Sequence, residues 1–219
     1  MSYQGGLSPE YLPEPQPGVK AISYLTVIKS DGTVRAWTGS EWKQLLSIRA
    51  EEIASDGISY VVYLTGDHKL FAVNLADDSV SVIAHDVRDF SYSPINELNY
   101  PADIFYVKED GALGYCRYAD RGGLCDREGE TLLPCEGAAV SCFGESFLLR
   151  QKDGTFLTGS PEGEAEPLDV KGAAGSLDGY GSWTVISEDG STVTHHQAAD
   201  PYFGISGGTV VYTFAPEKQ

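Results

Sequence analysis

The chain has few basic residues and no long apolar run. Lys and Arg number 15 against 32 Asp and Glu among 219 residues, so the formal net charge is -17. A surface this acidic repels phosphate backbones and anionic membranes, which argues against either as partner. No stretch of about 18 apolar residues is present, and residues 1–17 lack the basic start and apolar core of a signal peptide. We therefore predict a soluble, unexported, cytoplasmic protein that binds neither nucleic acid nor membranes.

Cysteines are also scarce, and their spacing fits no metal motif. Cys116, Cys125, Cys135 and Cys142 are separated by 9, 10 and 7 positions, with no C-x-x-C pair. A zinc site is therefore a weak interpretation, and a reducing compartment keeps thiols free. We expect free thiols, with Cys142 buried in an apolar run, and neither a metal nor a cofactor.

What the sequence does have is a repeated turn signal. Aspartates recur beside a glycine at positions 31, 67, 110, 153 and 189, at intervals of 36, 43, 43 and 36. Each lies between two runs rich in β-branched and aromatic residues, such as residues 24–28 and 33–37 around the first. Asp-Gly between such runs is a strong hairpin signal, and we assign it to a type I′ turn with positive φ at both central positions. Five hairpins are therefore predicted.

The flanks of the hairpins repeat as well. A serine followed by an aromatic residue precedes the turn at positions 23, 59, 146 and 182, and a further strand is readable after each hairpin, at residues 45–48, 80–83, 131–133, 168–170 and 209–214. Four short strands in each unit are typical of a β-propeller blade. Helix signals are nearly absent, and the one helix-like stretch, residues 48–54, is too short for an independent helix.

The predicted fold is all-β: a single β-propeller of about five four-stranded blades. We place it at residues 19–219, after an N-terminal extension at residues 1–18. The innermost strands are expected near Ile22, Phe90, Phe143 and Ala173, with these residues packed toward the axis.

One unit carries a family resemblance. Residues 31–39, Asp31 Gly32 Thr33 Val34 Arg35 Ala36 Trp37 Thr38 Gly39, followed by Gln44 and Leu45, resemble the propeller repeat of the regulator of chromosome condensation type. The second unit keeps the strand pattern without the Trp and Gln-Leu, and five units stand in place of seven, so no activity or functional residue of that family is carried over. The repeat size is also similar to small lectin propellers, and acidic repeat proteins of this kind occur among bacterial immunity proteins.

Strand direction sorts the connections between strands. In a four-stranded antiparallel blade, the connections from first to second and third to fourth strand leave one edge, and the Asp-Gly turns leave the other. The long connections, residues 91–101, 117–130, 160–167 and 197–208, all fall on the first of these edges. Acids and aromatics on this edge form the candidate partner-binding set. Its members are Trp42, Asp77, Asp78, Tyr92, Tyr100, Tyr118, Asp120, Asp126, Glu128, Glu130, Glu162, Glu164, Glu166, Tyr202 and Phe203.

Two functions suit this set. Carboxylates among aromatics suit a partner rich in Lys and Arg, so the first is an acidic immunity-type inhibitor that covers a basic toxin or effector. The second is a carbohydrate-binding, lectin-like propeller, which predicts the same aromatic at equivalent places in each unit. The aromatics do not repeat, and this favours one asymmetric protein partner. Alternatively, the acids only keep the surface soluble.

Enzyme motifs are missing from the sequence. It has no G-x-S-x-G, no H-E-x-x-H and no phosphate-cradling glycine loop. A propeller glycosidase needs carboxylates around a central funnel, and Asp103 and Glu145 are the only acids near inner strand starts. His195 and His196 are adjacent on a predicted strand, so they point to opposite faces. We predict that the protein is not an enzyme, and a catalytic site remains an alternative without nominated residues.

Overall fold

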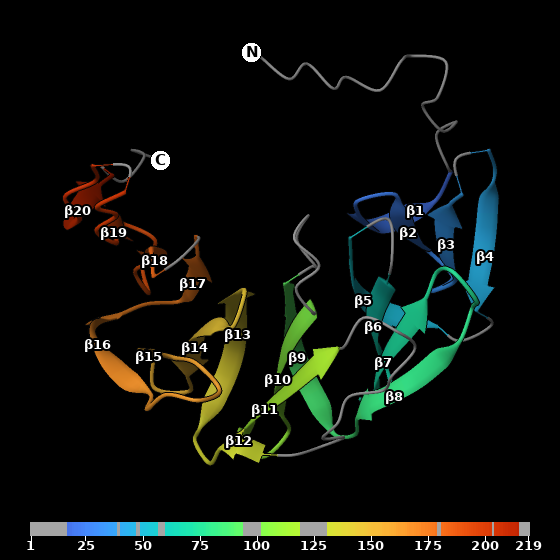
Figure 1. Ribbon diagram of the computed structural model, residues 1–219, viewed down its shortest axis with the longest axis horizontal. Helices are drawn as coiled ribbons and strands as arrows, with labels where there is room; N and C mark the ends of the chain where they lie inside the picture. The colour runs from blue at the N-terminus through green and yellow to red at the C-terminus, as the bar shows by residue number, and fades with distance from the viewer. Residues whose placement is uncertain are drawn as a thin grey trace. The chain divides into compact units, whose positions relative to one another are not determined.

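The computed structural model describes residues 17–38, 40–46, 49–56, 60–93, 102–118, 131–178, 181–202 and 204–214. These residues form five four-stranded antiparallel sheets, and they contain no helix (Figure 1). The predicted all-β propeller of about five blades is confirmed. No helix in the described part of the chain is long and apolar enough to span a membrane.

The chain divides into two compact units, Met1–Val82 and Ile83–Gln219. The strands of the first two blades are β1 (Val19–Ser23), β2 (Thr26–Lys29), β3 (Val34–Trp37), β4 (Trp42–Leu46), β5 (Ala50–Ser55), β6 (Tyr60–Thr65), β7 (Leu70–Asn74) and β8 (Val80–Ala84). Each sheet follows chain order, so every blade is a meander in which consecutive strands pair.

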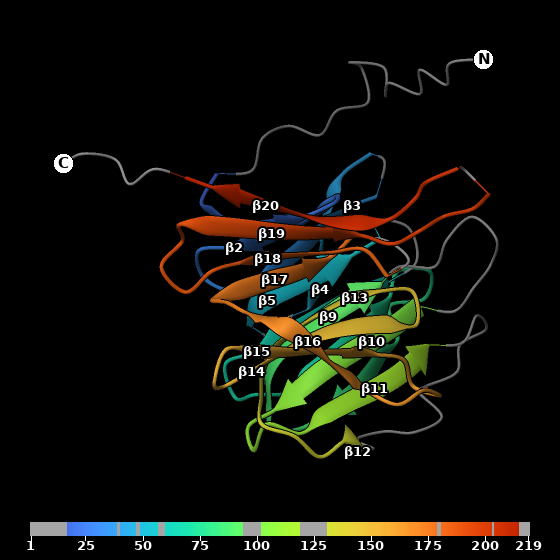
Figure 2. The same cartoon turned by 90° about the vertical axis from the view of Figure 1, so that its left-hand side faces the viewer.

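The remaining three blades follow the same plan. Their strands are β9 (Val87–Ser93), β10 (Ala102–Lys108), β11 (Leu113–Tyr118), β12 (Thr131–Leu133), β13 (Gly137–Phe143), β14 (Ser146–Gln151), β15 (Thr155–Gly159), β16 (Glu166–Lys171), β17 (Ala174–Leu177), β18 (Trp183–Ile186), β19 (Thr192–Gln197) and β20 (Gly208–Thr213). Figure 2 shows the last sheet in its order from β17 to β20.

All five predicted hairpins are present, but their turn type was predicted wrongly. At the first, the N–H of Gly32 bonds the carbonyl of Lys29 at 2.8 Å, and only Gly32 has a positive φ, of 83°. This is a three-residue loop that ends in a left-handed residue, not a type I′ turn. The carboxylate of Asp31 accepts the N–H of Thr33 at 2.9 Å, so the aspartate closes the turn with its side chain instead of adopting a positive φ.

The helix-like stretch at residues 48–54 forms no helix in its described part, as its shortness led us to expect. Its described part belongs to β5, the first strand of the second blade, which pairs with β6 from Ala50↔Thr65 to Ser55↔Val61. A stretch this short has weak helix propensity, and pairing with the fully buried β6 decides its conformation.

First strands of neighbouring blades are joined by side chains. In the first unit, the Ser23 hydroxyl accepts the Ser55 N–H at 2.9 Å. In the second unit, the side chains of three alternate residues of β9 accept backbone N–H groups along β13 and the turn after it. A side chain of β13 accepts a backbone N–H of β17 in turn. These pairs are Asp89–Val140 at 2.7 Å, Ser91–Cys142 at 3.0 Å, Ser93–Gly144 at 2.7 Å and Ser141–Leu177 at 3.0 Å.

Apolar clusters fill the space between blades within each unit. Ile28 and Val34 of the first blade pack with Val61 and Tyr63 of the second. In the second unit, Phe105 and Phe147 are the largest buried members of the cluster between the third and fourth blades. Leu148, Phe156, Leu177 and Val185 form the next cluster. Burial of these faces holds neighbouring blades together.

The four side chains expected on the innermost strands differ in burial. Phe90 is buried, whereas Ile22 is 69% exposed, Phe143 is 40% exposed and Ala173 is exposed. The strands themselves were found at the right places for β1, β9 and β13, but alternation turns Ile22 and Phe143 away from the clusters.

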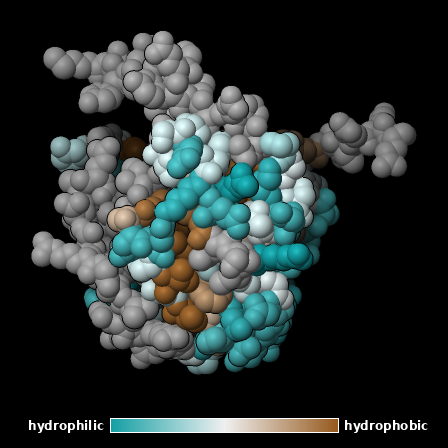
Figure 3. Space-filling view, turned by 90° about the vertical axis from the view of Figure 1, so that its right-hand side faces the viewer, coloured by the Kyte–Doolittle hydropathy of each residue, from teal (hydrophilic) through white to brown (hydrophobic). Residues whose placement is uncertain are grey.

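Figure 3 shows hydrophilic surface around one hydrophobic strip on the side where β4 and β8 lie in Figure 1.

The cysteines differ from expectation at one position. Cys116 is disulfide-bonded, so the prediction of free thiols is wrong there. Cys135 and Cys142 are free, as predicted. Burial raises the pKa of the Cys142 thiol to about 12, which keeps it protonated and unreactive at neutral pH.

Candidate functional site

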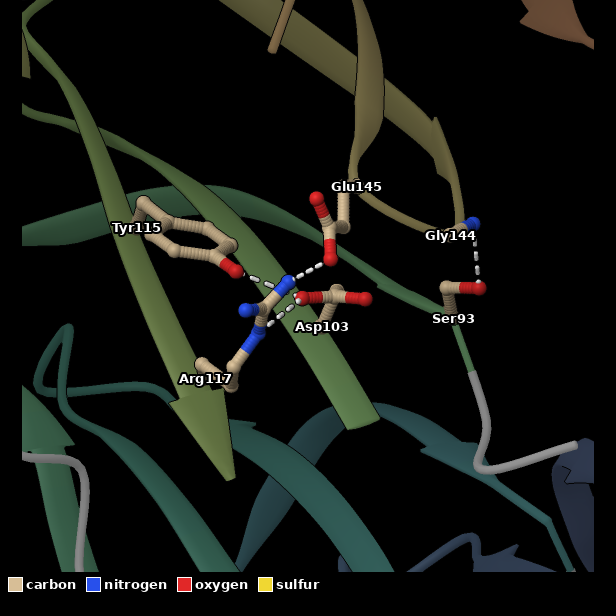
Figure 4. Close-up of polar contacts among 6 residues, drawn as sticks. All are labelled: Ser93, Asp103, Tyr115, Arg117, Gly144 and Glu145. Atoms are coloured by element: carbon tan, nitrogen blue, oxygen red, sulfur yellow. Dashed lines mark hydrogen bonds and ion pairs between the residues drawn. The ribbon is translucent and has the colours of Figure 1, made fainter. Parts of the chain in front are cut away.

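Each blade has a loop edge, where its first-to-second and third-to-fourth connections leave, and a turn edge, which carries its Asp-Gly turn. At the loop edge of the third blade, Asp103 lies near the start of β10, opposite Arg117 near the end of β11. Tyr115 is two residues before Arg117 and therefore on the same face of the sheet. Glu145 lies between β13 and β14, at the loop edge of the fourth blade. These four side chains meet in one cluster (Figure 4).

Asp103 is the centre of the cluster. It is 5% exposed, and its Oδ1 accepts a hydrogen bond from the Tyr115 hydroxyl at 2.6 Å. The Nε of Arg117 donates to the same oxygen at 3.4 Å, and its Nη2 pairs with Glu145 (Figure 4). Arg117 therefore links a buried and an exposed carboxylate that belong to neighbouring blades.

Burial dominates the electrostatics of Asp103. Loss of water raises its pKa, and the bonds from Tyr115 and Arg117 offset only part of that rise. The same burial, with the neighbouring Asp103 charge, raises the pKa of Tyr115, so the phenol stays a hydrogen-bond donor at neutral pH. A buried carboxyl with a raised pKa, held by a specific charged partner, is a pattern that marks many functional sites.

The seam between β9 and β13 fixes the geometry of this cluster. Ser93 accepts the N–H of Gly144, the residue directly before Glu145 (Figure 4). Likewise, the Ser91 hydroxyl accepts the N–H of Cys142, two residues before Gly144. The turn that carries Glu145 is thereby tied to the third blade, within reach of Arg117.

The predicted candidates of the first two blades are held by their neighbours. Trp42 lies against Trp37, with ring centroids 5.8 Å apart. Asp78 pairs with Lys43, and Asp77 accepts the Ser79 N–H at 2.9 Å. Hydrogen bonding from the Ser79 side chain, and then from its backbone, lowers the pKa of Asp77. These carboxylates are exposed, but local bonds already engage them.

The candidates of the other blades differ in their exposure. Glu162, Glu164 and Glu166 are exposed at the loop edge of the fourth blade, and none takes part in an ion pair among the described residues. Tyr202 is 89% exposed, between β19 and β20. Tyr92 is half-buried within β9.

The rest of the predicted set is not described. Tyr118 ends β11, and its side chain lies outside the described part of the structure. Six further candidates lie outside the described residues, and their roles stay predictions: Tyr100, Asp120, Asp126, Glu128, Glu130 and Phe203.

Sequence reasoning missed Tyr115 and Arg117. Asp103 and Glu145 were noted as acids near inner strand starts, but the two residues that bind Asp103 were not. The available signal was the spacing Tyr-x-Arg on a strand, which places both side chains on one face. This spacing could not reveal that Asp103 would lie opposite Arg117, because the register of the two strands depends on the length of the turn that joins them.

The two histidines on β19 point to opposite faces, as predicted. His195 Nδ1 is 2.9 Å from the Thr184 hydroxyl, which bonds Asp178 at 2.7 Å. His196 instead stacks on Trp183, with centroids 5.3 Å apart. The described residues hold no group of three or more His, Cys, Asp or Glu side chains that could bind a metal ion.

Comparisons with known proteins show the fold alone. No family model matches the chain, and no curated protein matches it in sequence. Human WBSCR16 matches 78% of this chain with a TM-score of 0.55 and 10% sequence identity. The structure of Kap60 bound to yeast RCC1 (Prp20) also matches 78% of this chain, with a TM-score of 0.55 and 10% sequence identity. BBS1N in complex with ARL6DN has 0.54 at 13% over 86%. The chain covers 58%, 53% and 63% of those chains, respectively, which is less than two thirds of each.

The resemblance to the regulator of chromosome condensation type is therefore structural. RCC1 is among the structural neighbours, together with other propeller proteins, and no family match extends the likeness to sequence.

Proposed function

We propose that this chain is a non-enzymatic protein-binding module whose acidic loop edge binds a basic protein. In its most specific form, the proposal is an immunity-type inhibitor that covers a basic toxin or effector. The function needs no cofactor and acts by occupying the cationic surface of its partner.

The distribution of charge in the fourth blade carries the proposal. Its loop edge presents Glu145, Glu162, Glu164 and Glu166. The basic residues between positions 137 and 171 are Arg150, Lys152 and Lys171, and all three lie at or next to the turn edge. Lys171 is 3.8 Å from Asp153 there, so part of the acid at that edge is neutralised. A blade with its negative charge at one edge attracts and orients a basic partner.

The cluster around Asp103 supports a binding role over a catalytic one. Tyr115 and Arg117 occupy Asp103 Oδ1, and Arg117 also holds Glu145. A general acid or base needs an oxygen directed at a substrate. The cluster acts instead as a rigid support that keeps Glu145, whose side chain is 55% exposed, in place at the loop edge.

Structural neighbours are consistent with protein interaction. The structures of RCC1 with Kap60 and of BBS1N with ARL6DN are complexes of propellers with other proteins. This likeness supports the general class, and the charge pattern supports the basic partner.

Charge reversal tests the proposal. The triple variant Glu162→Lys, Glu164→Lys, Glu166→Lys changes the loop edge, and Glu109→Lys, Glu136→Lys, Glu188→Lys makes the same charge change at exposed positions toward the turn edges. Both are tested for co-purification with the product of the neighbouring reading frame. The proposal predicts that the loop-edge variant loses the partner and the control keeps it. Equal retention by both variants, or no binding by the parent, contradicts it.

A carbohydrate ligand is the second candidate, favoured by one observation. Trp37 and Trp42 form a tilted pair at the loop edge of the first blade. Faces of Trp rings at a surface stack on sugars, as they do on other flat or apolar groups. Binding of the parent to an array of glycans, lost in Trp42→Ala and retained by the loop-edge triple variant, would favour this function over the first.

A further inference from the structure

Among the described residues, the outer strand of the last blade pairs along only one of its edges. β20 pairs only with β19 within the described part of the chain, and all six of its residues are exposed. Val210, Val211 and Tyr212 are 49%, 58% and 53% exposed. Figure 2 shows β20 at the border of its sheet. A long, apolar edge strand is a template for pairing with another strand.

The other outer strands carry protection that β20 lacks. β16 has charged residues and Pro167, and its pairing with β15 shifts register. β12 is three residues long, and β4 contains Lys43; both also have shifted registers. β8 is uncharged, but its Ile83 and Ala84 are buried. Charge, proline, shortness and bulges are the devices by which proteins block edge pairing.

The pairing of β19 with β20 is regular over six residue pairs, without a shift, from Thr192↔Thr213 to Gln197↔Gly208. Neither strand contains Asp, Glu, Lys or Arg. In a chain of net charge -17, this is a locally uncharged surface. It therefore has no negative charge that could attract a basic segment. It suits pairing with another uncharged strand that is rich in β-branched residues.

We propose that β20 pairs with β20 of a second copy, in an antiparallel arrangement across a two-fold axis. Such a contact is isologous, because the same strand supplies both sides, and it closes at two copies. Each copy satisfies the outward backbone groups of the other, and the exposed valines and Tyr212 form cross-strand pairs. This interface is separate from the acidic loop edges of the third and fourth blades.

Salt distinguishes this association from binding of a basic partner. Two copies that each carry a net charge of -17 repel one another, so added salt should strengthen the dimer. Binding of a basic protein should weaken as salt rises, because the attraction is screened. The two proposals can therefore fail independently.

The test is sedimentation of the full chain over a series of protein concentrations, at about 0.05 M and about 0.5 M NaCl. We expect a monomer–dimer equilibrium whose dissociation constant falls at least about tenfold at the higher salt. Val211→Lys should abolish the dimer, because each copy would place a charge at the paired edge. Val80→Lys, at a 44% exposed valine of the outer strand β8, is the matched control and should leave it intact.

Tyr212→Lys gives a second variant if Val211→Lys does not fold, as judged by circular dichroism. Hydrogen exchange adds a local readout, because β20 amides should become protected as protein concentration rises. A monomer at every concentration and salt, or an equal effect of Val80→Lys and Val211→Lys, would overturn the proposal. Growth beyond two copies would also overturn it, since a closed pair leaves no edge free.

Discussion

The Tyr115 hydroxyl lies 2.6 Å from the Asp103 carboxylate and donates a hydrogen bond to it, at the loop edge of the third blade. Asp103 is almost fully buried, so this bond replaces water that the carboxylate has lost. The arrangement keeps Arg117 between Asp103 and Glu145, and so links a buried carboxylate to an exposed one at the loop edge.

Tyr115→Phe should destabilise the protein. The change keeps the ring against Phe105 but removes one donor from a buried carboxylate, which costs about 1–3 kcal/mol in the free energy of unfolding. The pKa of Asp103 should rise further, because the lost bond lowers it. Urea denaturation measures the cost, with Tyr212→Phe as a control that removes an exposed hydroxyl. Equal unfolding midpoints for the two variants would show that the bond contributes nothing.

Asp89 should make the seam between β9 and β13 sensitive to pH. Burial raises its pKa, so the folded state binds this proton more tightly than the unfolded state does. The corresponding stability is present below the ordinary Asp pKa of 3.8 and is lost as pH rises through the folded-state value. Arg88 and Arg150 lie close enough to lower the pKa in part.

Two substitutions separate the charge of Asp89 from its hydrogen bond. Asp89→Asn keeps an oxygen for the Val140 N–H and removes the charge, so its stability relative to the parent should increase from about pH 4 to about pH 7. Asp89→Ala removes the acceptor and should cost about 1–3 kcal/mol. Urea unfolding across this pH range measures both. A constant difference between Asp89→Asn and the parent would exclude the titration of Asp89.

Glycines of the Asp-Gly turns should differ in their tolerance of a side chain. Gly111 has a φ of 96°, and an added Cβ would lie 3.0 Å from the Cys135 carbonyl oxygen. Gly190 has a φ of 69° and open space around it. Gly190→Ala should cost about 1–2 kcal/mol for the left-handed backbone alone, and Gly111→Ala should cost more because of the contact. Thermal unfolding of both variants would contradict this if their melting temperatures were equal.

Tyr202 should act as an anchor without supporting the fold. Because it is 89% exposed, Tyr202→Ala should leave the unfolding midpoint unchanged. If the basic partner covers this loop, the dissociation rate should rise about tenfold, because the loss of an aromatic anchor affects the dissociation rate more than the association rate. An unchanged dissociation rate would place Tyr202 outside the interface.

The sequence predicts the blades because their signals are local. The Asp-Gly turns at positions 31, 110, 153 and 189 all have a positive φ at the glycine and lie between paired strands. Their exact type was missed, since the Asp side chain closes the turn and removes the need for a second positive φ. The serine–aromatic signal also failed once: Tyr24 lies in a turn, with a φ of 51° and 73% exposure, whereas Tyr60 and Phe147 are buried.

The cluster around Asp103 could not be predicted, because its members come from two strands of one blade and a turn of the next. Asp103 and Tyr115 are 12 residues apart, and Arg117 and Glu145 are 28 apart. Their meeting depends on the register of β10 with β11 and on the Ser93–Gly144 bond. The exposed acids were predicted from strand direction alone, because a meander sends all loops of one kind to one edge.

The most direct test of the central claim is the association rate with a basic protein that co-purifies with this chain, measured by stopped flow as salt is raised. The parent should associate at a rate that falls at least about tenfold between low salt and about 0.5 M NaCl. The loop-edge variant should associate slowly at both salt concentrations; it carries Glu162→Lys, Glu164→Lys and Glu166→Lys. The control variant should associate at the same rates as the parent; it carries Glu109→Lys, Glu136→Lys and Glu188→Lys. Rates that are the same for the parent and the loop-edge variant, or that do not change with salt, would contradict the proposal that these acids recognise the partner.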